Sequence, residues 1–325
     1  MQQVPQDPVV RASWLVACRS EDVAEGKLVP VLLAGEDVVL WRSPTALHAW
    51  RDLCMHRGVK LSLGTLENCR LRCAYHGWAY DESGQCVHMP AHPSLKPPSK
   101  ARVGTFHAVE AAGMVWVCQA EEPGELPHLP EFDDASFRCI LCGPCPAEAG
   151  APRLIENFLD VAHLPIVHAG TLGVPERAEI GDYRVEEIAG GLLARDIRVF
   201  QPDPDGTRRA GGVSYDYGVL APFTVFLRKR QGGRCLTILF HVTPVTETRS
   251  TGHFAMFMNY GDPAEDAAAV DFQRMIFSQD RPVVESQRPE RLPLDLAEEL
   301  HLPSDRLAIA YRKYIRKCGL TFGTA

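Results

Sequence analysis

Two features that mark whole classes of protein are missing from this sequence: long apolar runs and stretches rich in lysine and arginine. The longest apolar segments are LVPVLLAG at residues 28–35 and AAGMVWVC at residues 111–118. Both are far shorter than the roughly 20 residues that a helix needs to cross a bilayer. Lys and Arg number 34 against 41 Asp and Glu, a net charge of −7, and no basic cluster typical of nucleic-acid binding is present. We therefore expect neither a membrane partner nor a nucleic-acid partner.

The first residues also lack the pattern of an export signal. MQQVPQDPVVRASW, residues 1–14, has no basic region followed by an apolar run. The 11 cysteines are an odd number spread over the whole chain. Together these observations predict a cytoplasmic protein with reduced thiols, most of them buried as small hydrophobic side chains.

What is present is the composition of an ordinary globular protein, with 46% hydrophobic and 23% charged residues among 325. Short β-branched and aromatic runs separated by Gly, Asp, Asn and Pro fill residues 14–118, which predicts strands. Strands are predicted again at residues 183–260, with helical periodicity before and after them. The expected fold class is α+β, with an all-β domain at residues 1–145 and an antiparallel sheet with helices at residues 146–325.

Two short units of cysteine and histidine lie in the predicted loops of the first domain. The first unit is Cys54-x-His56, and the second, after sixteen residues, is Cys73-x2-His76. Structural zinc prefers paired cysteines two to four residues apart, so these units fit it poorly. A Rieske [2Fe–2S] centre needs two cysteines on one iron and two histidines on the other, which matches one thiolate and one imidazole from each of two loops.

A second histidine pair lies in the segment PRLIENFLDVAHLPIVHAG, residues 152–170. Its apolar residues recur at helical spacing, and Pro165 should end or kink the helix. Such a kink could bring His163 and His168 to one centre, with Asp160 on the face of His163. Non-haem Fe(II) oxygenases use two histidines and one carboxylate. The residues alone leave four carboxylate candidates open: Asp271, Asp280, Glu285 and Asp295.

With both motifs in this order, the chain resembles the oxygenase component of Rieske non-haem iron oxygenases along nearly its whole length. The resemblance implies a Rieske cluster bound by Cys54, His56, Cys73 and His76. It also implies a catalytic domain with a helix-grip-like fold, in which a mononuclear Fe(II) is bound by His163, His168 and Asp280. SQDRPVVESQRP, residues 278–289, is similar to the family segment that supplies the third ligand.

The same resemblance implies roles for two more residues and for partner molecules. Asp160 would link His76 of one protomer to His163 of the next in a ring-like homotrimer, and Asn157 would lie beside the iron. Electrons would come from NAD(P)H through a flavin- and [2Fe–2S]-containing reductase or a ferredoxin. O2 and a small aromatic molecule would be the substrates.

The compact length is similar to that of homotrimeric monooxygenases such as vanillate and dicamba O-demethylases and toluenesulfonate methyl-monooxygenase. We therefore predict hydroxylation of a methyl, O-methyl or N-methyl group on an aromatic or polycyclic molecule, with demethylation as a possible outcome. The alternatives are an aromatic-ring cis-dihydroxylating dioxygenase or a Rieske-type desaturase. A Rieske electron-transfer protein without catalytic iron is a more distant alternative.

Several other groups permit two interpretations. Cys142-x2-Cys145 has no matching pair downstream, and its role stays open. Pocket candidates in the second sheet, or plain core residues, are Phe223, Phe226, Leu239, Phe254, Met256 and Met258. Candidates for an anionic substrate group, or ordinary surface residues, are Arg195, Arg198 and His241. The basic set near the C-terminus, a docking patch or a solvated helix end, is Arg312, Lys313, Arg316 and Lys317.

Overall fold

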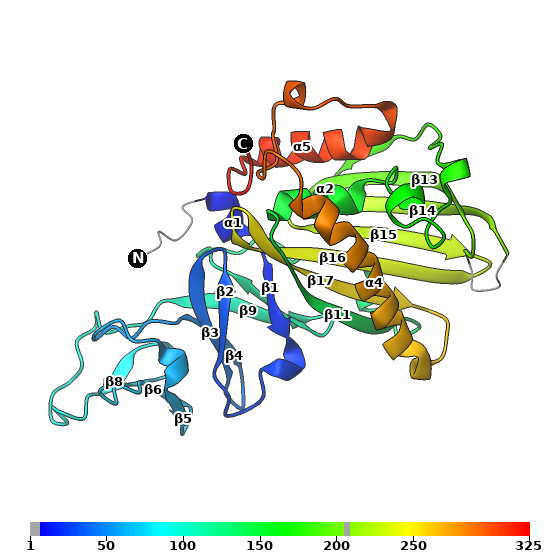
Figure 1. Ribbon diagram of the computed structural model, residues 1–325. Coiled ribbons are helices and arrows are strands. Elements are labelled where there is room, and N and C mark those ends of the chain that lie inside the picture. The colour runs from blue at the N-terminus through cyan, green and yellow to red at the C-terminus, as the bar shows by residue number, and fades with distance from the viewer. Residues whose placement is uncertain (1–6, 205–208) are drawn as a thin grey trace. The chain divides into compact units, whose positions relative to one another are not determined.

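The computed structural model describes residues 7–204 and 209–325, and the chain divides into two compact units (Figure 1). Unit 1 contains residues 10–125, and unit 2 contains residues 7–9 and 126–325. The division predicted at residues 145 and 146 therefore falls inside unit 2. The physical reason is strand β11, Arg138–Ala147, which pairs with β17, Arg249–Met258, and so carries residues before 146 into the second sheet.

Unit 1 consists almost entirely of strands in two antiparallel sheets. The larger sheet has six strands in the order β1-β10-β9-β4-β3-β2, and the smaller has the order β5-β6-β7-β8. The large sheet is formed by β1 Leu15–Arg19, β2 Val29–Leu33, β3 Glu36–Arg42, β4 Leu47–Arg51, β9 Thr105–Ala111 and β10 Met114–Cys118. The small sheet is formed by β5 Thr65–Glu67, β6 Arg70–Arg72, β7 Ala79–Tyr80 and β8 Cys86–His88. Short helical segments are α1 Pro8–Ala12, η1 Ser20–Asp22 and η2 Leu61–Leu63.

Unit 2 is built on one antiparallel sheet of seven strands in the order β11-β17-β16-β15-β14-β13-β12. Its remaining strands are β12 Val185–Ile188, β13 Gly191–Gln201, β14 Gly211–Ala221, β15 Thr224–Gln231 and β16 Arg234–Thr246. The helices are α2 Ala151–Leu159, α3 Leu164–Val167, α4 Asp266–Glu285 and α5 Arg306–Cys318. Single 3-10 turns are η3 Pro130–Phe132, η4 Pro175–Arg177, η5 Pro263–Glu265, η6 Leu296–Glu298 and η7 Pro303–Asp305. The predicted α+β class, with an all-β first part and an antiparallel sheet with helices in the second, is confirmed.

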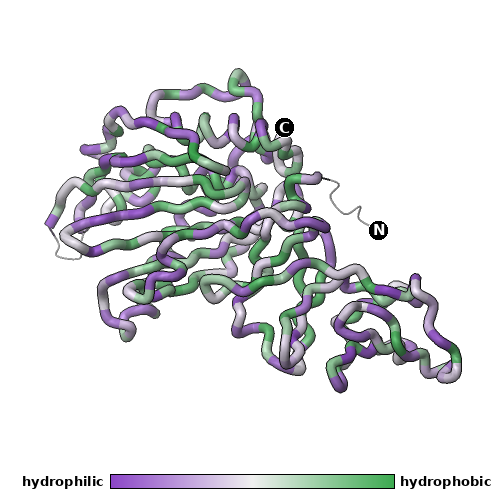
Figure 2. The backbone as a smooth tube through the Cα atoms, turned by 180° about the vertical axis from the view of Figure 1, so that it is seen from behind, coloured by the Kyte–Doolittle hydropathy of each residue, from purple (hydrophilic) through white to green (hydrophobic). Residues whose placement is uncertain are grey.

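Along the long strands of unit 2 successive side chains point to opposite faces, and the strand register decides which of them face the helices. Figure 2 shows hydrophobic and hydrophilic segments following one another along these strands. Helices α2 and α4 lie across one face of the sheet in Figure 1. In the register, Ile238 pairs with Met256 and Phe240 pairs with Phe254, so their side chains share the face beneath these helices. Leu239 and Phe226 pair with each other on the opposite face.

Among the described residues, no helix has the length and apolarity needed to cross a bilayer.

Candidate active site

Two loops of unit 1 present the predicted cluster ligands in matching conformations. In each loop a glycine four residues after the cysteine donates its N–H to the cysteine carbonyl: Gly58 to Cys54 at 2.9 Å and Gly77 to Cys73 at 3.0 Å. These glycines have φ of +69° and +68°, a backbone conformation that residues with a Cβ rarely adopt. Each loop therefore turns back tightly enough to direct a thiol and an imidazole to the same side.

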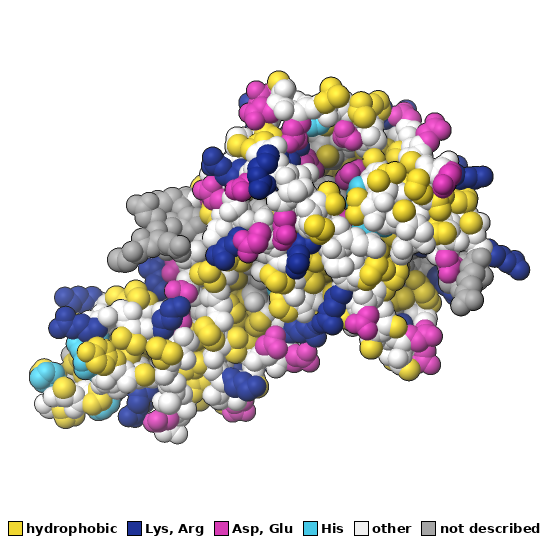
Figure 3. Space-filling model, in the orientation of Figure 1, with side chains coloured by type: hydrophobic (Ala, Val, Ile, Leu, Met, Phe, Trp, Pro, Cys, Tyr) yellow, Lys and Arg dark blue, Asp and Glu magenta, His cyan; other side chains and the backbone are white. Residues whose placement is uncertain are grey.

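The four side chains of these loops converge in pairs. The Cys54 and Cys73 thiols are both buried, and burial, with a smaller contribution from Cys54, raises the pKa of Cys73. Nδ1 of His56 lies 3.1 Å from Nδ1 of His76, and both rings reach the surface. Figure 3 shows histidine side chains gathered on the surface over the part of the chain that contains β6 and β8. Two adjacent sulfurs and two adjacent ring nitrogens are the donor set of a Rieske [2Fe–2S] cluster, so these residues fit that group.

Neighbouring aromatic residues hold the sulfur and nitrogen donors in place. The Tyr80 hydroxyl lies 3.2 Å from Cys54 Sγ and accepts a hydrogen bond from the Met55 N–H at 3.2 Å. Burial raises the pKa of Tyr80, so its hydroxyl stays protonated and can donate to the sulfur. The His56 ring stacks on Trp78 at 4.5 Å with an interplanar angle of 4°. The sequence motif did not single out Tyr80, which lies outside both loops.

In unit 2 the predicted helix is interrupted earlier than Pro165. Helix α2 ends at Leu159 because Asp160 adopts an extended conformation and its Oδ1 accepts the Ala162 N–H at 2.8 Å. The chain then starts the four-residue helix α3, with His163 before its first residue and His168 after its last. On a continuous helix, side chains five residues apart would point about 140° away from each other. The break therefore allows the two imidazoles to meet, with ring centroids 5.1 Å apart.

Asp280, on helix α4, completes a group of three metal donors. Its Oδ1 lies 3.0 Å from His168 Nε2 and 3.4 Å from His163 Nε2, and one donor atom of each residue lies within 4.8 Å of the others. Oδ1 is buried, yet it has no properly directed hydrogen bond within the described part of the chain. Three donor atoms that converge in this way can share a cation, and two histidines with one carboxylate fit a mononuclear iron.

The other carboxylate candidates lie elsewhere in unit 2. The Asp271 side chain is 79% exposed, and Asp295 caps the 3-10 turn η6. Glu285 accepts the backbone N–H of Glu148 at 3.0 Å. Gln279, which precedes Asp280, has Oε1 2.7 Å from His168 Nδ1, and such a contact orients a ligand imidazole.

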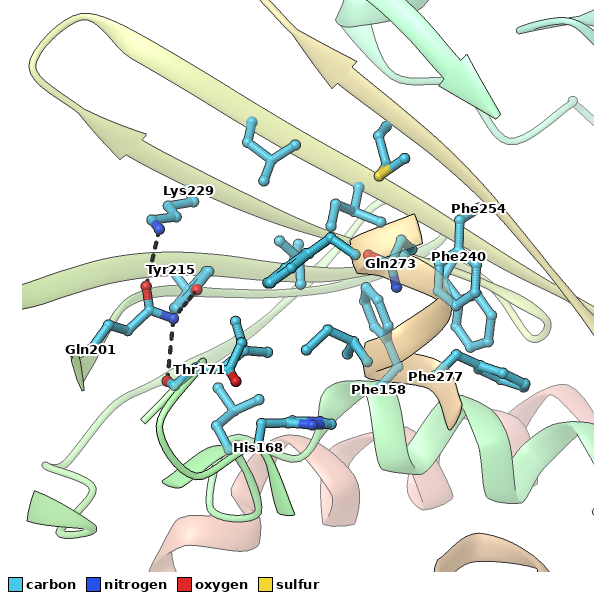
Figure 4. A pocket seen from close by; sticks show the side chains of 18 of the residues that line it. Phe158, His168, Thr171, Gln201, Tyr215, Lys229, Phe240, Phe254, Gln273 and Phe277 are labelled. Atoms are coloured by element: carbon cyan, nitrogen blue, oxygen red, sulfur yellow. Dashed lines mark hydrogen bonds between the residues drawn. The ribbon is translucent and has the colours of Figure 1, made fainter. Parts of the chain in front are cut away.

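A cavity of about 580 Å³ lies beside the three metal donors, between the helices and the sheet. Aromatic rings form much of its wall: Phe158 stacks on Phe240 at 5.1 Å, and Phe240 stacks on Phe254 at 4.3 Å. Phe277 meets Phe254 edge-on at 5.9 Å, and Asn157 also lines the cavity. Figure 4 shows these four phenylalanines on one side of the cavity. The space suits a flat, largely apolar molecule of more than one ring.

Each half of the chain matches a known protein family. Residues 13–106 match the Rieske [2Fe-2S] domain family, and residues 147–320 match the vanillate O-demethylase oxygenase C-terminal domain family. The chain belongs to the Rieske oxygenases with this catalytic domain.

This Rieske oxygenase is similar to characterised demethylases over most of its length. It is 32% identical to methylxanthine N1-demethylase NdmA of Pseudomonas putida over 88% of this chain and 81% of that protein. It is 29% identical to the oxygenase component of dicamba O-demethylase of Stenotrophomonas maltophilia, over 85% of this chain and 87% of the other. The solved structure of NdmA with caffeine superposes with a TM-score of 0.84 at 29% identity, covering 95% of this chain and 90% of that one.

Membership of this family also indicates which cofactors the oxygenase uses. It contains a Rieske [2Fe–2S] domain, and enzymes of its family use a mononuclear iron and electrons from NADH delivered by a reductase. Part of this chain is also similar to oxidoreductase NdmD of Pseudomonas putida, to which it is 37% identical over 38% of this chain and 21% of that protein. A reductase is therefore a partner of this oxygenase.

The structure separates the two interpretations that the sequence left open for several candidates. Phe223, Phe226 and Leu239 do not line the cavity, because the two-residue repeat of the strands places Phe226 and Leu239 on the opposite face. Their predicted companions Phe254, Met256 and Met258 do line it. His241 is fully buried and its Nδ1 lies 2.9 Å from Thr224 Oγ1, so it cannot meet a substrate anion. Arg195 and Arg198 are exposed and lie outside the cavity wall.

Both interpretations of Arg312 from the sequence are wrong, because Arg312 is neither a docking residue nor part of a solvated helix end. Only 3% of its surface is exposed, and its guanidinium donates to Glu156 at 2.6 and 2.9 Å and to Glu299. Lys313, Arg316 and Lys317 are exposed as expected. On helix α5, residue 312 directly follows buried Tyr311 and shares its side of the helix, which the charge pattern alone did not reveal.

Charges near the metal donors predict a pH-dependent affinity for iron. In the metal-free protein, burial alone would lower the pKa of His163, but Asp160 and Asp280 outweigh it and raise the pKa to about 9. Below that pH a proton occupies the ring and must leave before a metal binds. We expect the affinity for Fe(II), measured anaerobically, to fall about tenfold per pH unit between pH 8 and 6.5. Affinity that stays constant over this range would contradict the assignment of His163 as a ligand.

Proposed function

We propose that this Rieske oxygenase removes N-methyl or O-methyl groups from a planar aromatic substrate by hydroxylating the methyl carbon. The main observation in support is that His163, His168 and Asp280 form part of the wall of an aromatic cavity large enough for such a molecule. The relatives support the same reaction, since NdmA acts on a methylxanthine N-methyl group and the second relative is an O-demethylase.

The chain's own residues would bind and orient the substrate. Phe158, Phe240 and Phe254 offer stacked ring faces, which hold a flat molecule by dispersion and exclude water. Gln273 is 7% exposed and lines the cavity from α4, where its amide can hydrogen-bond a ring nitrogen or carbonyl group. A substrate held in this way would turn one edge toward the three metal donors.

The metal-donor set explains why hydroxylation is the proposed chemistry. Fe(II) held by His163, His168 and Asp280 would supply O2 activation, because two histidines and one carboxylate leave coordination positions open. Asn157 and Phe158 would keep the methyl carbon close to those positions. A hydroxylated methyl group on nitrogen or oxygen is a hemiaminal or hemiacetal, which breaks down to formaldehyde and the demethylated product.

Electron supply forms part of the proposal. In a ring-like homotrimer, Asp160 would connect His76 of one protomer to His163 of the next. Asp160 Oδ2 lies 3.6 Å from His163 Nδ1, and 35% of the carboxylate side chain is exposed, so one side can meet another protein group. The proposed setting is the cytoplasm, where NAD(P)H is available to the reductase. Sedimentation that shows a stable, active monomer would contradict the trimer and this bridge.

Asp160→Asn tests the bridge. We expect the variant to retain both iron centres, because the carboxylate contacts His163 from behind rather than binding the metal. Oxidation of the pre-reduced cluster on adding O2 and substrate should slow by at least about tenfold, since the charge that orients His163 is lost. Asp182→Asn is a matched control on the exposed surface of unit 2. Single-turnover kinetics that match the unmodified enzyme would remove Asp160 from the path.

Product analysis tests the proposed reaction against its alternatives. Holoenzyme, a reductase and NADH are incubated with a panel of N-methyl and methoxy aromatic compounds, and formaldehyde and demethylated products are quantified. Formaldehyde in a one-to-one ratio with the demethylated product supports demethylation. A cis-diol or a new carbon–carbon double bond without formaldehyde would assign the chain to dihydroxylation or desaturation. About two irons per chain, with no product and rapid cluster oxidation, would indicate electron transfer alone.

A further inference from the structure

The cavity has a polar side that the proposed demethylation does not explain. Figure 4 shows Lys229, Gln201 and Tyr215 together on the side away from the four phenylalanines. Lys229 lies on β15 opposite Leu236, and Phe240 lies four residues further along β16. At about 3.3 Å per residue, these two levels of the sheet are about 13 Å apart. A substrate that spans the cavity can therefore meet both sides at once.

A partly buried hydrogen-bond network holds the Lys229 ammonium group in this position. Lys229 Nζ donates to Gln201 Oε1 at 3.0 Å and also to the Pro204 carbonyl. Gln201 is 1% exposed, and its Nε2 donates to the Leu172 carbonyl at 3.2 Å and to Tyr215 Oη at 2.8 Å. Each polar group of the Gln201 amide is thus used, so its orientation is determined and the position of Lys229 follows from it.

Tyr215 adds a second hydrogen-bond donor on this side. Its oxygen already accepts from Gln201, so the hydroxyl hydrogen is directed elsewhere, and the residue lines the cavity. Burial raises the pKa of Tyr215, which keeps the hydroxyl protonated. An ammonium group and a tyrosine hydroxyl can both donate to a ligand oxygen.

The charged residues of the cavity wall fit an acidic ligand. Among the described residues of the wall, apart from Asp280 and the two histidines, the charged side chains are Lys229, Arg234 and Asp203. The Arg234 guanidinium lies 5.5 Å from the Tyr260 ring centroid. The described wall is otherwise mainly apolar, which strengthens any charge interaction inside it.

We propose that Lys229, positioned by Gln201 and assisted by Tyr215, selects a substrate that bears a carboxylate at the end opposite its methyl group. This inference rests on the proposed demethylation and specifies its substrate. The aromatic frame lies against the phenylalanines, the carboxylate accepts from Lys229 and Tyr215, and the methyl group faces the metal donors. A neutral aromatic compound of the same shape lacks the charge that this side of the cavity recognises.

Equilibrium binding to the holoenzyme, without reductase and without O2, tests this selection. The probes are 6-methoxy-2-naphthoate and its neutral isostere 6-methoxy-2-naphthamide, which differ only at the end remote from the methoxy group. We expect the carboxylate to bind about 10- to 100-fold more tightly than the amide, the range of a charge-assisted hydrogen bond. Lys229→Met should remove this preference while leaving the affinity for the amide within about twofold. Arg195→Met, an equal charge change on exposed β13, should leave the preference intact.

Tyr215→Phe is a second test that keeps the buried ring, in case Lys229→Met fails to fold. It should reduce the carboxylate preference several-fold. Equal binding of the two probes to the unmodified enzyme, or a Lys229→Met variant that weakens both alike, would overturn the selection. The same probes with reductase and NADH separate the two proposals. Formaldehyde from both at equal efficiency would overturn the selection and leave demethylation standing, whereas preferential carboxylate binding without formaldehyde would support the selection and refute demethylation.

Discussion

Asp280→Asn is expected to abolish turnover while the Rieske cluster stays intact. The substitution keeps the shape of the side chain but removes the negative charge that faces His163 and His168. Changes beside a metal ligand already cost about 10- to 100-fold in metal affinity or activity, so loss of a ligand charge should cost at least about 100-fold in rate. Iron analysis should show about two of three irons per chain retained, because two belong to the cluster.

Asp271→Asn is the matched control for this variant, since it lies on the same helix with an exposed side chain. It should retain full iron content and activity. The EPR signal of the reduced cluster should be the same in both variants, which separates loss of the mononuclear site from general misfolding. An Asp280→Asn enzyme with normal iron content and turnover would show that a different carboxylate completes the site.

Arg312→Met should destabilise unit 2 by about 3–5 kcal/mol, the usual cost of leaving a buried charge without its partner. The variant leaves Glu156 and Glu299 without the guanidinium that joins them, and Glu156 is 9% exposed. Burial already raises the pKa of Glu156 despite Arg312, and removal of the arginine should raise it further. Because protonation then relieves the buried charge, the destabilisation should be smaller at pH 5 than at pH 8.

The measurement for Arg312→Met must follow unit 2 specifically. All five tryptophans lie between residues 14 and 116, so their fluorescence reports on unit 1. Hydrogen exchange of α5, or unfolding followed by far-UV circular dichroism, reports on the affected sheet and helices. Lys313→Met, at the exposed adjacent position, should stay within about 0.5 kcal/mol of the unmodified protein. An Arg312→Met variant as stable as this control would show that the charge network contributes nothing to the fold.

The Glu156–Arg312 contact also bears on the active site. Glu156 precedes Asn157 on α2, and the same helix ends at Leu159, directly before Asp160. Arg153, 2% exposed, donates to Glu299 at 3.0 Å and to the Pro289 carbonyl at 2.8 Å. These contacts tie α2 to α5 and to the segment after α4, and so help to hold the elements that carry His163 and Asp280.

The residue types alone predicted the donor sets of both centres, because coordination chemistry restricts which side chains can serve as ligands. Cys54-x-His56 with Cys73-x2-His76 matches one kind of cluster, and the histidine pair at 163 and 168 matches one kind of iron site. Alternating and helical periodicities were enough for the α+β class, since each reflects one buried face of a strand or helix. The candidate cluster ligands of unit 1 could be predicted best, because they lie in two short loops that turn locally.

The positions of residues that depend on contacts between distant segments could be assigned only from the tertiary structure. Asp280 could not be separated from Asp271 by chemistry, because which carboxylate meets His163 depends on how α4 crosses the sheet. Leu239 and Phe240 are adjacent apolar residues, and the strand register alone puts one in the cavity and the other behind it. Arg312 resembled a surface cation because its partner Glu156 lies 156 residues away, and Lys229 became a cavity residue only when β13 and β15 came together.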